Sequence, residues 1–228
     1  MSPEKAELCG LIASDGGLGI YWKYSEERGY YQSSYKSYFS SSDQELIETF
    51  SHLVEEVYHE TPRVYEDKEG FDAYVYDRKV YFDLADIGAK TGPFEFRVPR
   101  EHLDEEGKRK YLRGFFSGDG EAYREAHGYV IEFESTCKEG IEEIHETLED
   151  LGFHPHPIHP RDYDEENWHR NYRFTIPSAE HIKFIEEIGS DKPSHQEVFE
   201  EIKKYREGIR QYKLREHEER KSRKYEDE

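Results

Sequence analysis

Apolar residues recur at two spacings along this chain, and segments of the two kinds alternate. Helical spacing, with apolar positions three or four residues apart, runs through residues 4–15, 43–59 and 138–151. Alternation at every second residue, which is typical of strands, runs through residues 19–25 and 31–40. The pattern therefore predicts an α+β fold in which helices alternate with pairs of strands.

The remaining segments extend this order and repeat it in the second half. In the first half we expect strands near 62–67 and 71–84, with a turn at 77–78, and a short helix near 84–88. In the second half we expect helices over 108–119, 138–151, 178–188 and from 194 to at least 210, with strand-like sequence over 121–136, 153–160 and 170–176. The order helix, two strands, helix, two strands, helix thus occurs twice.

Two short stretches carry the same pattern, one in each half of the chain. Residues 8–16 read LCGLIASDG and residues 112–120 read LRGFFSGDG, so each is an apolar helical segment that ends on Asp-Gly. An internal duplication of this kind predicts a pseudo-twofold pair of similar units. We place the units at residues 1–106 and 107–210, followed by a charged carboxy-terminal extension over 211–228.

Small residues stand at helical spacing in both motifs, which allows two helix backbones to approach closely. The small residues that we expect at such a helix interface are Gly10, Ser14, Gly114 and Gly118. If the two helices pack against each other, their carboxyl ends meet at one edge. Asp15 and Asp119 then lie side by side.

Two carboxylates at the negative ends of two helix dipoles repel each other, and a divalent cation removes that cost. Aspartate oxygens suit Mg²⁺, and a pair of such ions favours the hydrolysis of a phosphodiester. Asp15 and Asp119 are therefore candidate metal ligands and catalytic residues.

The two motifs resemble those of the LAGLIDADG homing endonucleases, in the form that carries both motifs on one chain. Two copies at domain spacing, each followed by paired strands, carry the resemblance, and the similar segments 86–90 and 187–192 add to it. The resemblance implies αββαββα halves with the motif helices at their interface, and two antiparallel sheets that form a DNA-binding saddle. Ala13 departs from the family pattern, in which an acid often stands at that position.

The resemblance also implies a function. It suggests a monomeric endonuclease that cuts double-stranded DNA at a long pseudo-palindromic site with Mg²⁺, which Mn²⁺ or Ca²⁺ can replace in binding. The last acid of each motif would hold the metal, which carries over to Asp15 and Asp119. The family usually places a basic residue near the metal, and Lys90 and Lys192 stand at equivalent places in the repeated segments. Genes of this family reside in introns or inteins, or stand alone.

Polar side chains that alternate along the predicted strands are candidates for DNA contacts, because hydroxyls, amides and cations suit base edges and phosphates. The candidates are Tyr21, Lys23, Arg28, Gln32, Ser34, Lys36, Tyr38, Arg78, Lys79, Arg124, Arg170 and Arg173. A merely solvated strand face would show the same polarity. The paired motifs are therefore what favours DNA as the partner.

The charge of the chain points in the opposite direction. There are 52 acidic residues against 32 Lys and Arg, which gives a formal charge of −20 and weakens attraction to phosphate. Glu132 and Glu134 fall on an expected outer strand face, although Glu can accept a hydrogen bond from cytosine N4. A catalytically weak or inactive LAGLIDADG-derived protein that binds nucleic acid, either an RNA-splicing maturase that binds structured RNA or a DNA-binding regulator, is therefore the alternative.

Cys9 and Cys137 are the only cysteines, which disfavours a disulfide framework and favours a reducing compartment. No apolar run approaches the ~18 residues that a membrane span needs. The amino terminus is charged and does not resemble a targeting signal. We therefore expect a cytoplasmic protein without a membrane partner.

Overall fold

The structure is a computed structural model that describes residues 1–27, 29–89, 95–126, 128–161 and 170–226, with side chains except at 213 and 216–226. The first half contains α1 (Pro3–Asp15), β1 (Gly16–Ser25), β2 (Tyr30–Ser41), α2 (Gln44–Tyr58), β3 (Arg63–Glu66), β4 (Phe71–Val75) and α3 (Arg78–Asp86). The second contains α4 (Glu105–Asp119), β5 (Gly120–Glu125), β6 (Gly128–Ser135), α5 (Lys138–Asp150), β7 (His159–Arg161), β8 (Asn171–Thr175), α6 (His181–Glu187) and α7 (Pro193–Glu226). Short 3₁₀ turns occupy Arg100–His102 and Ser178–Glu180.

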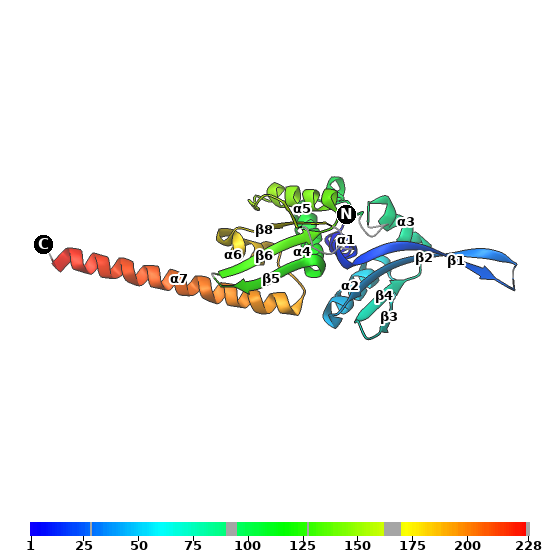
Figure 1. Ribbon diagram of the computed structural model, residues 1–228, viewed down its shortest axis with the longest axis horizontal. Coiled ribbons are helices and arrows are strands. Elements are labelled where there is room, and N and C mark those ends of the chain that lie inside the picture. The colour runs from blue at the N-terminus through cyan, green and yellow to red at the C-terminus, as the bar shows by residue number, and fades with distance from the viewer. Residues whose placement is uncertain (28, 90–94, 127, 162–169, 227–228) are drawn as a thin grey trace.

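The strands form two four-stranded sheets with the same topology. Their orders are β1-β2-β4-β3 and β5-β6-β8-β7, and all neighbouring strands are antiparallel. α1 and α4 pack side by side at the centre, with one sheet on either side (Figure 1). The predicted α+β fold with two αββαββα units is confirmed.

Each motif helix has an N-terminal cap and passes directly into a strand. The Ser2 hydroxyl accepts a hydrogen bond from the Lys5 amide over 3.3 Å, and the Asp104 carboxylate accepts one from the Gly107 amide over 2.8 Å. Gly16 and Gly120 begin β1 and β5 with extended backbone. The first glycine after each aspartate thus starts the strand, so β1 begins at Gly16 and not at the expected residue 19.

The two motif helices cross at their glycines. A Cβ atom at Gly10 would lie 2.1 Å from the Tyr111 carbonyl oxygen, and one at Gly114 would lie 2.2 Å from the Glu7 carbonyl oxygen. Both distances are shorter than any non-bonded contact can be, so only glycine allows this approach. Residues 6–14 of α1 are all buried as a result.

The core repeats in the two halves. Phe39 pairs with Gly16 in the first sheet and Phe133 pairs with Gly120 in the second, and both phenylalanines are fully buried. The register therefore places Phe39 and Phe133 at equivalent positions beneath the motif helices. This equivalence allows the two sheets to be compared residue by residue.

The prediction of a strand over 71–84 is wrong beyond Val75. Asp77 caps a helix there, because its carboxylate accepts from the Lys79 amide over 2.7 Å and from the Val80 amide over 2.9 Å. α3 thus begins at Arg78 and not near Leu84. The alternating apolar residues of this segment had suggested a strand. The Asp77 cap and the packing of Val80 in the core stabilise a helix instead.

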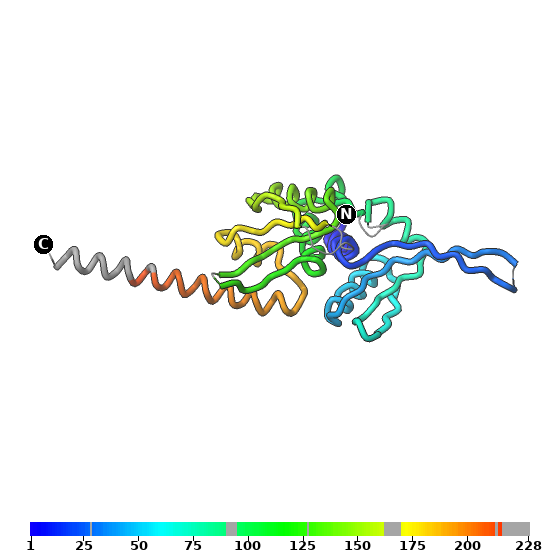
Figure 2. The backbone as a smooth tube through the Cα atoms, viewed as in Figure 1, coloured from blue at the N-terminus to red at the C-terminus, as the bar shows by residue number. Residues whose placement is uncertain are grey.

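Two other boundaries also differ from the sequence prediction. β7 covers only His159–Arg161, where a strand over 153–160 was expected. α4 begins at Glu105, so a domain boundary between residues 106 and 107 would cut its first turn. α7 has 34 residues and continues without a break past residue 210, and its orange segment already extends away from the body of the protein (Figure 2).

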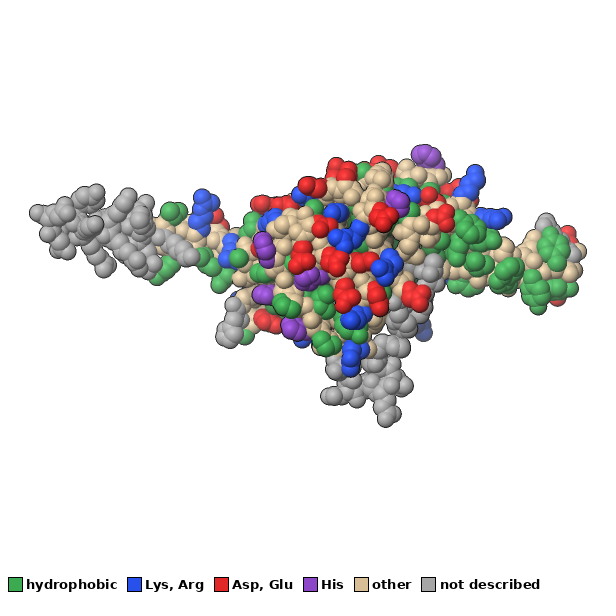
Figure 3. Space-filling view, turned by 90° about the horizontal axis from the view of Figure 1, so that it is seen from above, with side chains coloured by type: hydrophobic (Ala, Val, Ile, Leu, Met, Phe, Trp, Pro, Cys, Tyr) green, Lys and Arg blue, Asp and Glu red, His purple; other side chains and the backbone are tan. Residues whose placement is uncertain are grey.

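The hairpin of β1 and β2 also projects from the body, with its tip far from the helices (Figure 1). The alternation in β1 predicted one buried face, yet only the base of the strand is buried. Ile20 and Trp22, on the apolar face, are 42% and 67% exposed. Hydrophobic side chains therefore cover the surface of this arm (Figure 3).

Among the described residues, no helix combines the length and the apolar character that a membrane crossing requires.

Gly10→Ala and Gly114→Ala should each lower the free energy of unfolding by about 3 kcal/mol, because the added methyl group meets a backbone carbonyl of the other helix. Gly208→Ala is the matched control, since a Cβ there meets nothing within 4 Å. In α7 it should leave stability unchanged or raise it by up to ~1 kcal/mol. Urea denaturation measures all three variants, and equal midpoints would contradict the close crossing.

Candidate metal centre and nucleic-acid interface

Asp15 and Asp119 end the two motif helices and line the same open cavity of about 600 Å³. Ser14 and Gly118, the residues before them, line it as well. A Cβ at Gly118 would lie 2.0 Å from Ser14 Oγ and 3.4 Å from Asp15 Oδ2. The missing side chain thus lets the end of α1 lie against the end of α4, which brings the two aspartates to one place.

The four predicted interface residues all lie between the motif helices. Gly10 faces the backbone of α4, Gly114 faces the backbone of α1, and Ser14 meets Gly118. Ser14 also donates a hydrogen bond to the Leu11 carbonyl over 2.8 Å. This bond directs the hydroxyl back into its own helix.

The residues at this cavity fit a hard divalent cation. Two carboxylates lie where two helix dipoles present their negative ends, which favours positive charge. Within the part of the chain that the structure describes, no group of three or more His, Cys, Asp or Glu could hold a metal ion. Mg²⁺ typically takes one or two carboxylates and completes its shell with water and substrate phosphate. Asp15 and Asp119 supply two carboxylates, which is the number that this mode of binding uses.

Of the two predicted basic residues, Lys192 lines the cavity that holds both aspartates. Lys90 lies outside the described residues. Thr136 and Asn171 line the cavity too, and the sequence pattern did not single them out. They come from the end of β6 and the start of β8, which only sheet pairing brings beside α4.

In the first sheet, one lysine is surrounded by tyrosines on the outer face. Lys36 Nζ lies 4.7, 4.6 and 4.2 Å from the ring centres of Tyr21, Tyr38 and Tyr74. The register places Lys23, Gln32 and Ser34 on this same face. Arg28 lies outside the described residues.

Two predicted contact residues of the first half lie elsewhere. Arg78 and Lys79 stand in the first turn of α3, because this segment is a helix and not a strand. The Arg78 guanidinium lies 5.5 Å from the rings of Tyr35 and Phe82. Tyr35 belongs to the face opposite Lys36, so Arg78 is directed away from the lysine-bearing face.

In the second sheet, acidic and basic side chains pair on the outer face. Arg173 lies 3.3 Å from Glu132, and Arg161 lies 3.4 Å from Glu134. Burial raises the pKa of Glu132, and the nearby Arg173 partly offsets this effect. The arginines of this face thus already have carboxylate partners.

Arg124 and Arg170 lie elsewhere in the second half. Arg124 pairs with Tyr129 across β5 and β6, and its guanidinium lies 6.0 Å from that ring. The Tyr129 ring in turn lies 5.8 Å from Tyr205 of α7, so Arg124 is on the face that α7 covers. Arg170 is exposed immediately before β8.

Equivalent positions of the two sheets therefore differ in charge. In the first sheet Ser40 donates a hydrogen bond to Asp72, its partner across the strands. The equivalent pair in the second sheet is Glu134 opposite Arg173. By the same register, Val130 occupies the place of Lys36. The two halves thus have the same backbone fold, but the outer faces of their sheets carry different side chains.

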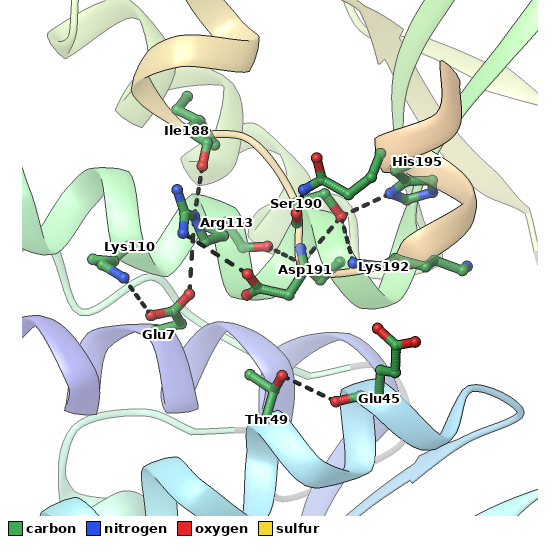
Figure 4. A network of polar contacts seen from close by, with 12 residues as sticks. Glu7, Glu45, Thr49, Lys110, Arg113, Ile188, Ser190, Asp191, Lys192 and His195 are labelled. Atoms are coloured by element: carbon green, nitrogen blue, oxygen red, sulfur yellow. Dashed lines mark hydrogen bonds and ion pairs between the residues drawn. The ribbon is translucent and has the colours of Figure 1, made fainter. Parts of the chain in front are cut away.

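A buried carboxyl group lies between the motif helices on the side away from the strands. Glu7 of α1 is 5% exposed and lies 2.8 Å from Lys110 Nζ of α4, with Arg113 Nε at 3.9 Å (Figure 4). Burial raises the pKa of Glu7 to about 7, and Lys110 only partly counteracts this. The periodicity over residues 4–15 predicted a helix here but not a buried charged group.

Because the folded chain holds the Glu7 proton up to about pH 7, and an unfolded carboxyl releases it near pH 4.5, stability should fall as pH rises between these values. Glu7→Gln removes this contribution. The midpoint of thermal unfolding of wild type, relative to Glu7→Gln, should therefore decrease from pH 4.5 to 7 and then level off. Glu101→Gln, an exposed control, should follow wild type. A constant difference between wild type and Glu7→Gln would contradict the buried protonated state.

Residues 106–189 match the family model of the LAGLIDADG-like domain. None of the curated proteins matches this chain. Among solved structures, the complex of I-DmoI with DNA and Mn has a TM-score of 0.60 at 18% identity and covers 82% of this chain and 96% of that one. The complex of I-DmoI with DNA and Ca has a TM-score of 0.62 at 18% identity and covers 86% of this chain and 96% of that one.

The N-terminal LAGLIDADG domain of DUF199/WhiA is also similar, with a TM-score of 0.53 at 15% identity over 83% of this chain and 84% of that one. The resemblance to the LAGLIDADG family that the two motifs indicated is thus confirmed. The chain has the two-domain fold of the homing endonuclease I-DmoI.

Proposed function

We propose that this LAGLIDADG-fold protein is a site-specific endonuclease that cuts double-stranded DNA with divalent metal bound by Asp15 and Asp119. One observation carries the proposal. The ends of two paired motif helices bring these carboxylates into a single cavity, which also receives Lys192. I-DmoI, which has the same fold, was solved with DNA and Mn and with DNA and Ca, which supports divalent metal as the cofactor.

The chemistry follows from the groups at the cavity. A bound Mg²⁺ would neutralise phosphate charge and increase the acidity of water. Asp15 and Asp119 would hold and orient it, and the Lys192 ammonium would stabilise negative charge as it develops on the phosphate. Both motifs belong to one chain, so we propose a monomer with two units that divide just before α4, at the Asp104 cap.

The two outer sheet faces would contact the DNA differently. Lys36 and Lys23 of the first sheet can bind phosphates, while the tyrosine hydroxyls beside them can reach base edges. In the second sheet, Glu132 and Glu134 can accept hydrogen bonds from base amino groups, as Glu does from cytosine N4. We therefore propose that the first half contributes most of the phosphate binding.

One observation favours a second candidate, a protein that binds nucleic acid without cutting it. The arginines of the second sheet are paired with carboxylates, and the chain carries a charge of −20. Both reduce attraction to a polyanion. The partner of such a protein would be duplex DNA or structured RNA.

Asp15→Asn and Asp119→Asn should each abolish metal-dependent cleavage and leave duplex binding intact, because amides are poor ligands for Mg²⁺ but neutral toward phosphate. Cleavage of a randomised duplex library with Mg²⁺, from low to high salt and against an EDTA control, identifies the target and measures the loss. Glu101→Gln is the matched control. Cleavage by either asparagine variant at the wild-type rate would refute the metal assignment.

If Lys36 contacts a phosphate, Lys36→Ala should weaken duplex binding by about tenfold. It should also reduce the slope of log affinity against log salt concentration by about one, because one fewer counterion is released on binding. Arg124→Ala is the control, since Arg124 lies on the opposite side of its sheet against Tyr129. Its affinity should equal that of wild type. Titration of a labelled target duplex at several salt concentrations distinguishes the two variants, and equal losses would contradict the assigned faces.

A further inference from the structure

The helix that carries Asp119 also holds the turn that precedes Lys192. Polar side chains four residues apart on one face of α4 contact residues 187–191. Figure 4 shows one of these contacts, between Arg113 and the Ile188 carbonyl. The contacts are Arg109 Nε to Glu187 Oε2 at 3.3 Å, Arg113 Nε to the Ile188 carbonyl at 2.7 Å, and the Asp191 amide to Ser117 Oγ at 2.8 Å. Residues 187–191 thus lie along two helical turns of α4.

Ser190 connects this turn to Lys192. Its side chain is buried, with 2% exposed, and its hydroxyl oxygen accepts a hydrogen bond from the Lys192 amide over 3.1 Å. The same oxygen lies 3.2 Å from Ser117 Oγ and 2.9 Å from His195 Nδ1. The backbone at Lys192 is therefore held by a hydroxyl that two other buried side chains position.

His195 extends the network to the metal-binding end of α4. It is 3% exposed, and its ring interacts with the backbone of Gly120, the residue that follows Asp119. Burial and the nearby Lys192 charge lower the pKa of His195 to about 4, so the ring is neutral near pH 7. A neutral imidazole has one acceptor nitrogen and one donor nitrogen, and His195 Nδ1 lies 2.9 Å from the Ser190 hydroxyl oxygen.

The first half has different residues at these positions. Alignment of the two motif glycines places Cys9 and Ala13 of α1 where α4 has Arg113 and Ser117, and both are buried among apolar side chains. Neither side chain can make the contacts of its counterpart. The polar network is thus a feature added to the second half and not part of the repeated fold.

We propose that Ser117, Ser190 and His195 are positioning residues that hold Lys192 beside Asp119. The proposal rests on the proposed nuclease function, because it gives Lys192 a role at the scissile phosphate. A flexible lysine contributes little to a reaction unless its backbone is fixed, and misplacement by about 1 Å can cost roughly a hundredfold in rate. A buried hydroxyl and a neutral imidazole supply that constraint without adding charge.

Single-turnover cleavage of the target tests the proposal in a double-mutant cycle. Ser190→Ala and His195→Ala should each lower the cleavage rate constant by about tenfold to a hundredfold and leave the affinity for DNA unchanged. In a Lys192→Met background, the same changes should have no further effect. Ser51→Ala, which removes a hydroxyl that donates to the Ile47 carbonyl of α2, is the control.

Additive losses in this cycle would show that the network supports folding only, and would overturn the proposal. So would an unchanged rate in Ser190→Ala. Ser117→Ala provides a milder variant if the others fail to fold.

Amide hydrogen exchange tests the anchor without any cleavage. In Ser117→Ala the Asp191 amide loses its acceptor and should exchange about fivefold to tenfold faster, while amides of α2 should not change. Equal exchange would overturn the proposal even if the protein cuts DNA. If the anchor is present but wild type cuts no duplex, the proposed function fails, and the role of Lys192 fails with it.

Discussion

The close crossing of α1 and α4 is the contact on which the rest of the structure depends. At Gly10 and Gly114 the space for a side chain is taken by a carbonyl of the other helix. Because the backbones touch there, the ends of the helices also meet, and Ser14 fills the space that Gly118 leaves. The sheets begin one residue later, at Gly16 and Gly120, so the same crossing sets their relative placement.

This crossing concentrates negative charge at one edge. Two helix dipoles and two aspartates face one cavity. Among the described residues, the cationic side chains that line this cavity are those of Lys192 and Arg161. Charge is arranged differently at the opposite end of the interface between α1 and α4. There Glu7 is buried, its pKa is raised to about 7, and Lys110 and Arg113 lie close to it. The electrostatics at one end of the helix pair thus favour positive charge, whereas the burial of Glu7 at the other end favours a protonated carboxyl group.

The two halves illustrate how a duplicated fold acquires different surfaces. The buried positions remain alike, as Phe39 and Phe133 show, because both must fill the same space under a motif helix. The outer faces are under no such constraint. Lys36, which lies among tyrosines in the first sheet, is replaced by Val130 at the equivalent position of the second sheet. Asp72 of the first sheet is likewise replaced by Arg173. Likewise Arg113 and Ser117 bind the 187–191 turn, while Cys9 and Ala13 only fill space.

The sequence by itself determined the order of helices and strands, the duplication and the two motif aspartates, because periodicity and repeated glycines are local properties of the chain. It could not determine that 78–84 is a helix, since the cap at Asp77 competes with an alternating pattern. Nor could it show that Trp22 is exposed or that Glu7 is buried, because burial depends on which elements cover a residue. The arrangement of Ser117, Ser190 and His195 around Lys192 was decided only by the tertiary structure, which brings residues far apart in sequence within hydrogen-bond distance.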